Sequence, residues 1–483
     1  MKENVKSIGL LTAVAALALS AGMASGQCQI TTGPDVIVGD ITGPSNYTFA
    51  SGLESTSLGT VSCNIGNAQL LWIAGNNQHP VIGGNLYKYT AATGPGTYGK
   101  FEQIAQSWLK HGFYALSQTL CCPSCAGTNG STLGIGCSDP YTSARNGSEG
   151  GLGPRRQVNA STGVFTYPPA NPTFATNQRR LSPLPIDLTA SSTTVKYFGE
   201  SQYVTPDDAS SGNKFNNSSV REMTVTGSGT AWAFGLTGVT VRRTAAIERW
   251  AFHDPAVLLE TVIVPNALPI ATDPYKGEGK YIVGSRATDL GGGIWHYEYA
   301  IFNQNSHRSG GSFDVPVPAG VVVTNVGFHD VAYLAGDGEG NVAYSGTDWA
   351  SDTSGNKVGW ATEAQSVNTN ANALRWGTTY NFRFDANTPP VTNGQATVGL
   401  WRAPAANEPA NFTARVMSPS APVGTPCDVD WNGDDAVDVP DIFAFLSDWF
   451  LDVPAAQNFG GQTGVPAIFA YLSEWFAHGV GPC

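Results

Sequence analysis

An internal repeat near the C-terminus constrains the fold of this chain more than any other feature. Residues 439–450 read VPDIFAFLSDWF and residues 465–476, at an offset of 26, read VPAIFAYLSEWF, with nine of twelve positions identical. Each copy has proline where the first turn of a helix tolerates it, followed by apolar residues at spacings of three and four. The repeat predicts two short amphipathic helices that pack against each other. We expect this contact to join Ile442, Leu446 and Trp449 to Ile468, Leu472 and Trp475.

An acidic segment stands directly before the first of these helices. Side-chain oxygens fall at positions 1, 3, 5, 9 and 12 of a twelve-residue loop, and a backbone carbonyl supplies position 7. This is the spacing with which an EF-hand loop surrounds Ca²⁺. An acidic turn without an ion is the alternative, but it does not explain why a helix begins where the loop ends. We predict one calcium ion, held by Asp430, Asn432, Asp434, Ala436, Asp438 and Asp441.

The corresponding loop of the second copy lacks these ligands. Its positions 1 and 12 are Ala456 and Ala467, and Asn458 is the one residue at a ligand position with a side-chain oxygen. We predict no ion there. Residues 427–483 contain eight Asp and one Glu but no Lys or Arg. Because these charges repel one another, we expect this module to fold in a calcium-coupled manner.

The N-terminal segment predicts export. Residues 1–26 carry Lys2 and Lys6, then an apolar run from Ile8 to Ala21, and then small residues that suit signal peptidase. The run is too short for a membrane anchor, so we interpret it as a signal peptide that is removed. Cys28 follows closely, which raises the alternative of a lipoprotein. We expect a secreted protein, free outside the cell or at its surface.

The cysteines support this assignment. An even number of cysteines outside the cytosol favours disulfides. Their grouping predicts one bridge between the first two, two bridges within the cluster at 121–137, and one bridge between the last two. A redox CxxC motif or a zinc site in the cluster is the alternative. The eight residues are Cys28, Cys63, Cys121, Cys122, Cys125, Cys137, Cys427 and Cys483.

The long region 27–417 has the composition of a β protein. The chain contains 57 Gly and 30 Pro and only 13% charged residues, which excludes a coiled coil or long-helix protein. Short apolar runs recur between turn residues, as in one or two β-sandwich or jelly-roll-like units. We expect one helix over Phe101–Leu120 and an internal boundary near 167–190. A Pro-rich linker, 418–426, then leads to the small α-helical module 427–483.

Chemistry is harder to locate in this region. Two Phe-His-Asp triplets, 252–254 and 328–330, either place a histidine beside a carboxylate for acid–base work or simply end strands. The loop 336–341 is either a second cation site or a hairpin tip. A glycoside hydrolase needs two carboxylates across a sugar, but the sequence cannot show which acids converge. The acids considered are Glu222, Glu248, Glu260, Glu298 and Asp330.

The C-terminal residues resemble a known family. The DxNxDxxxDxxD spacing, the two helix copies and the terminal cysteines at 427 and 483 resemble dockerin modules, in particular the bacterial "GC-type dockerin domain-anchored" group. Segments 196–217, 295–316 and 372–390 look similar to N-terminal regions of uncharacterised exported proteins that carry such tails. The resemblance implies an EF-hand-type calcium module whose two ends lie together. It also implies docking onto a cohesin-like partner or sorting to the cell surface.

These observations narrow the function without naming a reaction. A net charge of −12 argues against a nucleic-acid partner, and no apolar run after the signal is long enough for a transmembrane anchor. We expect an exported protein whose β-rich region is a binding or structural module. Its C-terminal module would attach the protein to a partner or sort it to its location. The alternatives are a polysaccharide-degrading enzyme delivered by its dockerin-like tail, and a surface adhesion component.

Overall fold

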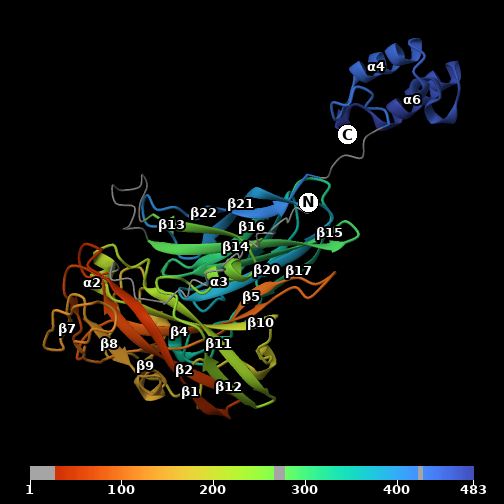
Figure 1. Ribbon diagram of the computed structural model, residues 1–483. Coiled ribbons are helices and arrows are strands. Elements are labelled where there is room, and N and C mark those ends of the chain that lie inside the picture. The colour runs from red at the N-terminus through yellow and green to blue at the C-terminus, as the bar shows by residue number, and fades with distance from the viewer. Residues whose placement is uncertain (1–27, 266–277, 422–427, 483) are drawn as a thin grey trace, which may run out of the picture.

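The computed structural model describes residues 28–265, 278–421 and 428–482. The fold is mainly β, with antiparallel sheets followed by a small helical module at the C-terminus, as expected from the sequence (Figure 1). Two predictions concern residues outside this range: the signal peptide 1–26, and the pairing of Cys427 with Cys483.

Sheets 1 and 2 form a first β-sandwich. Sheet 1 has the strand order β1-β2-β8, and sheet 2 has the order β12-β11-β10-β4-β6-β9, with β5 also paired to β4. The strands of sheet 1 are β1 (Val36–Ala50), β2 (Leu53–Asn64) and β8 (Ser138–Tyr141). The strands of sheet 2 are β4 (Val81–Thr90), β5 (Lys100–Gln106), β6 (Leu109–Lys110), β9 (Leu152–Gly153), β10 (Val195–Val204), β11 (Ser218–Ser228) and β12 (Ala231–Leu236).

Short elements decorate this first unit. One small two-stranded sheet and several single-turn helices lie in the connections between its strands. They are β3 (Leu70–Leu71), β7 (Thr132–Leu133), α1 (Ser143–Asn146), η1 (Glu149–Gly151), η2 (Arg155–Gln157), η3 (Pro185–Asp187) and α2 (Pro206–Ser210).

Sheets 3 and 4 form a second β-sandwich. Sheet 3 has the order β13-β14-β15-β20-β17, and sheet 4 the order β18-β19-β16-β21-β22. The strands of sheet 3 are β13 (Leu258–Val264), β14 (Gly279–Gly291), β15 (Ile294–Asn303), β17 (Val323–His329) and β20 (Thr378–Ala386). The strands of sheet 4 are β16 (Gly310–Pro316), β18 (Ala350–Asp352), β19 (Lys357–Ala361), β21 (Pro390–Leu400) and β22 (Asn411–Pro419). A 3-10 turn, η5 (Glu339–Asn341), lies between β17 and β18.

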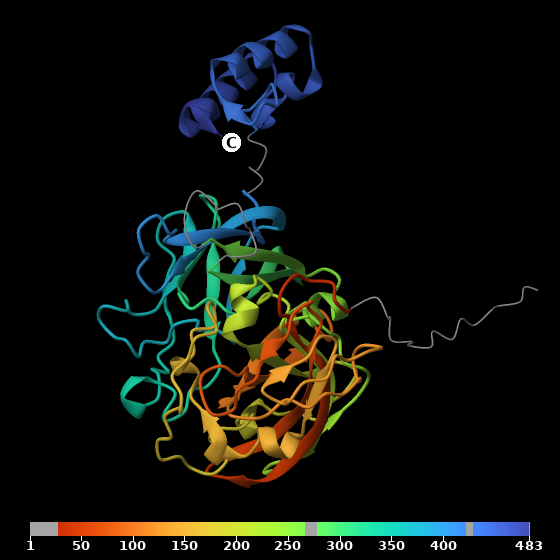
Figure 2. The same ribbon diagram turned by 90° about the vertical axis from the view of Figure 1, so that its left-hand side faces the viewer.

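The two sandwiches pack together through sheets 2 and 3, which gives four sheet layers (Figure 2). Tyr197 of β10 enters the core of the first sandwich, whereas its neighbour Phe198 enters the layer between sheets 2 and 3. Tyr299 of β15 likewise enters the core of the second sandwich, and Ala300 enters the shared layer. Helix α3 (Glu248–His253) fills part of this layer. Both faces of the inner sheets are therefore buried, and their strands carry buried polar residues such as Glu200 and Asn381 beside the apolar ones.

The structure corrects three sequence expectations. Residues 101–120 form no helix: β5 and β6 stand there, and Phe101 and Ile104 enter different cores, as side chains on opposite faces of a strand do. The segment 167–190 is not a boundary, because β10 after it pairs with β4 before it. The chain instead passes from the first sandwich to the second between β12 and β13. Strand β22 extends to Pro419, so the predicted linker 418–426 begins inside a sheet.

The C-terminal module contains the two predicted helices, α4 (Val439–Phe450) and α6 (Val465–His478). The shorter α5 (Pro454–Gln457) and η6 (Phe459–Gly461) connect them. β23 (Ala436–Val437) pairs with β24 (Gly481–Pro482), which brings the beginning and the end of the module together.

The contact between α4 and α6 differs from the predicted one. Its centre is Phe445 and Tyr471, whose rings stack with centroids 3.9 Å apart. Of the six residues predicted for this contact, Trp475 is buried and the other five are only partly buried around it. Phe445 lies three residues after Ile442 and therefore on the same face of α4. The prediction named the correct face but did not include Phe445, its most buried residue.

Candidate metal centre

Three carboxylates converge in the loop before α4. Asp430, Asp434 and Asp441 each offer an oxygen, and these oxygens all lie within 4.8 Å of one another. Within the described residues this is the single such group of His, Cys, Asp or Glu side chains. The arrangement can hold a metal ion, because a cation offsets the repulsion among the clustered charges.

The loop wraps its backbone around the first carboxylate. The Oδ1 atom of Asp430 accepts hydrogen bonds from the amides of Gly433 and Asp434, at 2.8 and 3.1 Å, and its Oδ2 accepts from Asp435 at 2.9 Å. Gly433 and Asp435 have φ of 73° and 65°, the left-handed conformation that such a tight turn requires. Asp435 occupies position 6, where an EF-hand loop has glycine, and aspartate adopts the required conformation.

The last carboxylate belongs to the start of α4. Asp441 is fully buried, and its two oxygens accept hydrogen bonds from the amides of Asn432, at 3.1 Å, and Asp438, at 2.8 Å. The side chain therefore ties the entrance of the loop to the first turn of the helix. No Lys or Arg of the described residues forms an ion pair with this buried carboxylate, which is costly unless a cation lies beside it.

The remaining predicted ligands surround this cluster. Asn432 is hydrogen-bonded to Asp434 through both its amide nitrogen and its oxygen, at 2.9 Å each. Asp438 has a buried Oδ1 with no hydrogen-bond partner among the described residues. Burial raises the pKa of Asp438, and the charges of Asp434, Asp441 and Asp430 raise it further. Ala436 lies in β23. An unpartnered carboxylate oxygen beside three others fits a hard, oxygen-seeking cation.

The second copy has a different local structure. Ala456 and Ala467, which align with the first and last ligands of the acidic loop, are fully buried in the core around Phe445. Gly460, Gly461 and Gly464 all have positive φ and turn the chain without a carboxylate at the centre. The loop of the second copy therefore contributes apolar side chains to the core of the module, whereas the loop of the first copy contributes carboxylates.

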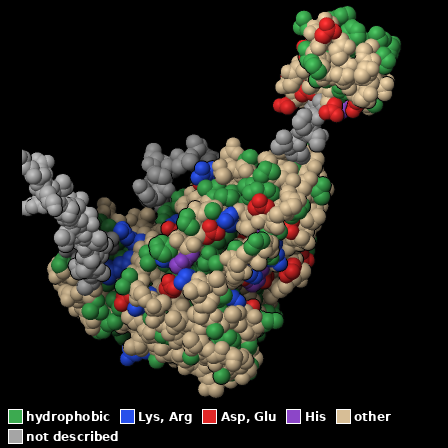
Figure 3. Space-filling view, turned by 45° about the vertical axis from the view of Figure 1, so that its right-hand side comes forward, with side chains coloured by type: hydrophobic (Ala, Val, Ile, Leu, Met, Phe, Trp, Pro, Cys, Tyr) green, Lys and Arg blue, Asp and Glu red, His purple; other side chains and the backbone are tan. Residues whose placement is uncertain are grey.

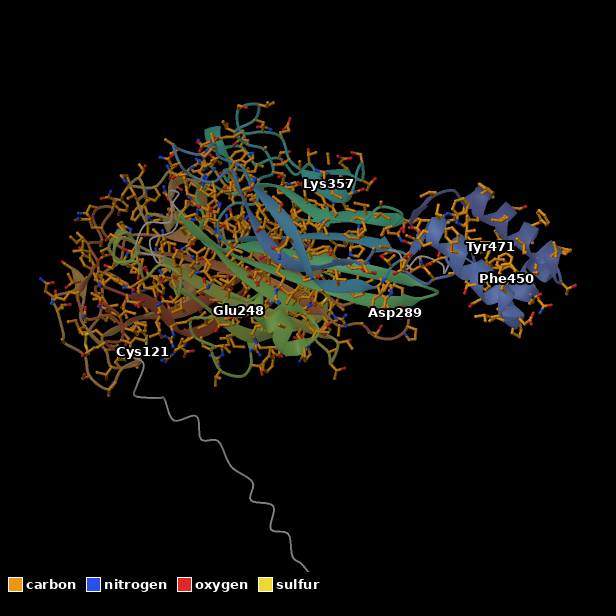
Figure 4. All side chains as sticks on the ribbon, turned by 90° about the horizontal axis from the view of Figure 1, so that it is seen from above. Cys121, Glu248, Asp289, Lys357, Phe450 and Tyr471 are labelled. Atoms are coloured by element: carbon orange, nitrogen blue, oxygen red, sulfur yellow. A yellow bond between two sulfur atoms is a disulfide. The ribbon has the colours of Figure 1, made fainter. Side chains whose placement is uncertain are left out.

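Each helix of the module also carries an exposed apolar stripe. Val439, Phe443 and Phe450 are 51, 67 and 74% exposed on α4. The residues 26 positions later, Val465, Phe469 and Phe476, are 54, 65 and 71% exposed on α6. Hydrophobic side chains are visible on the module's surface in Figure 3, and Figure 4 labels exposed Phe450 and buried Tyr471. The repeat thus exposes equivalent apolar side chains on both helices.

The disulfides differ from the predicted pairing. Cys28 does not pair with Cys63: each is bonded to a member of the cluster. The reason is tertiary, because β2, which ends next to Cys63, pairs with β8 and so lies against the cysteine cluster. None of the six described cysteines is free, which leaves no thiolate for a zinc or redox site there. The bridges are Cys28–Cys122, Cys63–Cys121 and Cys125–Cys137, and they indicate an oxidising, extracellular-type environment.

The residues considered for catalysis are dispersed. In the first triplet, His253 lies 3.9 Å from Glu222, whereas Asp254 binds Arg286 at 2.8 Å. In the second, His329 lies 3.8 Å from Glu102, whereas Asp330 accepts a hydrogen bond from Asn372. Histidine and aspartate thus have separate partners in both triplets, as neighbouring residues normally do.

The other three acids also occupy separate surroundings. Glu248 accepts a hydrogen bond from the amide of Ala245 at the start of α3, and Glu260 lies 3.7 Å from Arg415. Glu298 is buried beside His296.

No helix in the described part of the chain is both long and apolar enough to cross a membrane. A comparison with protein-family models finds no match. A comparison with curated proteins finds none either.

Proposed function

We propose that this is an exported protein whose C-terminal module binds one calcium ion and attaches the β-rich region to a partner at or beyond the cell surface. The observation that carries the proposal is the convergence of Asp430, Asp434 and Asp441 in a loop that leads directly into α4. Three disulfides support the extracellular setting.

Calcium is the cation that this ligand set favours. All its side-chain ligands are oxygen atoms, four of the six residues are aspartates, and no Cys or His takes part. Zinc prefers nitrogen and sulfur ligands, and magnesium holds several waters and rarely uses an all-protein cage. Calcium is also abundant outside cells, where modules of this kind bind it with dissociation constants of about 10⁻⁴ to 10⁻³ M.

The exposed stripes supply the docking surface. An apolar ring in water is unfavourable, and here the repeat places the same exposed residues on both helices. The partner that fits is a protein domain with a complementary apolar surface, of the cohesin-like kind that the dockerin resemblance implies. Calcium would act indirectly, by holding the start of α4 and thus the stripe formed by Val439, Phe443 and Phe450.

A calcium titration of the full chain, freed of metal with EDTA, tests the first part of the proposal. Calorimetry should show one ion bound per chain, with binding lost in Asp430→Ala and retained in Asn458→Ala, which removes the one side-chain oxygen at a ligand position of the second copy. Absence of uptake at millimolar calcium, or equal losses in both variants, would contradict a single ion in the first loop.

Attachment is tested separately in cells that export the protein. We expect EDTA washing to release it from the surface, and a Phe443→Ser/Phe469→Ser double variant to appear in the medium. Retention that survives both changes would contradict docking through the module.

A further inference from the structure

A pocket lies where the two sandwiches meet, outside the C-terminal module. The first unit contributes Ser107, Trp108 and Arg155 to its wall, and the second contributes His307, Arg375 and Arg402. The loop after β17 connects the two units at this pocket, because the indole of Trp108 donates a hydrogen bond to Asp337 at 2.6 Å. Asp337 of the segment 336–341 is thus bound to the first unit, whereas Glu339 and Gly340 at its tip are exposed.

Two guanidinium groups in this pocket make no ion pair with the described residues. Neither Arg375 nor Arg402 has a carboxylate within 4.0 Å in the described part of the chain. They are close enough that Arg375 lowers the pKa of Arg402, after the larger effect of burial. A buried cation such as Arg375 is strongly unfavourable without a partner, and the charge of the partly buried Arg402 beside it adds repulsion. Such a pair is stabilised when an anion binds between them.

Arg375 is fixed by its neighbours, but one of its hydrogen-bond donors remains unused. It is 8% exposed, and its guanidinium lies 3.6 Å from the ring centroid of Tyr344 and 4.6 Å from that of Trp401. Its Nη2 donates to two backbone carbonyls, at 3.2 Å each. Its Nε is buried and has no acceptor among the described residues. The aromatic contacts thus help to hold the guanidinium in place, while its unused donor needs an acceptor.

The other charged groups of the pocket are already engaged. Arg155 donates to backbone carbonyls of both units, including Ser107 at 2.8 Å and Gly377 at 3.3 Å. Asp337 accepts from Trp108 and from the amide of Leu334, and faces Arg155 rather than Arg402. His307 is neutral at neutral pH, because burial and then Arg402 and Arg375 lower its pKa to about 4. Arg156 lies 3.9 Å from Glu339. Glu339 and Glu278 offset part of the charge of Arg402 from a distance, whereas no carboxylate of the described residues touches the guanidinium of Arg375 or Arg402.

We propose that this pocket binds the oxyanion group of an acidic saccharide, through Arg375 and Arg402. The group is the carboxylate of a uronic acid or the sulfate of a sulfated sugar, both of which match the planar fork of a guanidinium. Aromatic side chains, Trp108, Tyr344 and Trp376, supply the apolar wall against which a sugar ring packs. The extracellular-type setting indicated by the disulfides is where such saccharides occur.

This proposal does not depend on calcium binding by the C-terminal module. Its test is made in EDTA, so that a failure of saccharide binding does not contradict the calcium proposal, and the reverse. Calorimetry with the full chain at low ionic strength would compare oligogalacturonate with its neutral methyl ester, galactose 6-sulfate with galactose, and inorganic sulfate alone. We expect one of the two acidic sugars to bind and its neutral counterpart not to bind. Added salt should weaken the binding.

Variants locate the site. Arg402→Gln should weaken binding about 10- to 100-fold, the effect of losing charge-assisted hydrogen bonds, and Arg402→Lys should weaken it less because the charge remains. Arg415→Gln, which removes a half-exposed arginine outside the pocket, serves as the control. Equal binding of acidic and neutral sugars would overturn the proposal, as would unchanged binding in Arg402→Gln. Inorganic sulfate binding as tightly as the sugar would show an adventitious ion only and would also overturn it.

Discussion

Asp441→Asn tests whether calcium holds the C-terminal module together. The carboxylate of Asp441 is fully buried and accepts hydrogen bonds from two loop amides, at 3.1 and 2.8 Å. Asparagine has nearly the same shape but no charge, and its NH₂ group would face one of those amides. The variant therefore loses both a calcium ligand and one acceptor.

The magnitude follows from mass action. With a dissociation constant of about 10⁻⁴ to 10⁻³ M, about 10 mM calcium stabilises the folded module by about 1.4 to 2.7 kcal/mol. In the variant this calcium-dependent gain should fall to about zero. Without calcium, the loss of one buried acceptor should lower the free energy of unfolding of the module by about 1 to 3 kcal/mol.

Hydrogen exchange of the full chain measures this locally, through peptides that cover α4 and α6. Calcium should slow exchange in the wild-type helices about 10- to 100-fold, and in Asn458→Ala by the same factor. Exchange in Asp441→Asn should not respond to calcium. A full calcium response in Asp441→Asn would refute the assignment of this carboxylate as a ligand, and with it our account of how the loop is coupled to α4.

Three further predictions concern stability and disulfide pairing. Phe445→Ala removes a ring from the centre of the module and should cost about 3 to 5 kcal/mol by local hydrogen exchange, whereas exposed Phe443→Ala should change it by less than about 0.5 kcal/mol. Burial raises the pKa of Asp139 to about 7, so the folded state binds this proton more tightly than the unfolded state, and stability should fall as pH rises from about 4 to 7. Thermal unfolding across that range should show a flatter pH dependence in Asp139→Asn, and an unchanged slope would contradict the assignment. Non-reducing peptide mapping should recover three linked pairs, and finding the first two cysteines linked together would contradict the pairing: Cys28–Cys122, Cys63–Cys121 and Cys125–Cys137.

The parts of this molecule that could be predicted from sequence are those whose geometry is local. The acidic loop spans twelve residues, so spacing alone places Asp430, Asp434 and Asp441 around one point. The two helices follow from the same kind of short-range pattern. The helix expected over residues 101–120 failed because strands buried on both faces lose the alternation that identifies them, and β5 has apolar residues on either side.

The disulfides and the pocket could not be predicted because they depend on how distant strands pair. Nothing near Cys28 in the sequence indicates Cys122, 94 residues away, as its partner. Arg155, Arg375 and Arg402 likewise belong to no motif, and they meet only because sheets 2 and 3 pack face to face. A lone arginine in a loop is normally a solvated surface charge. Arg375 differs because the fold buries it, places it against two aromatic rings and leaves its Nε without an acceptor among the described residues, and each of these facts requires the tertiary structure.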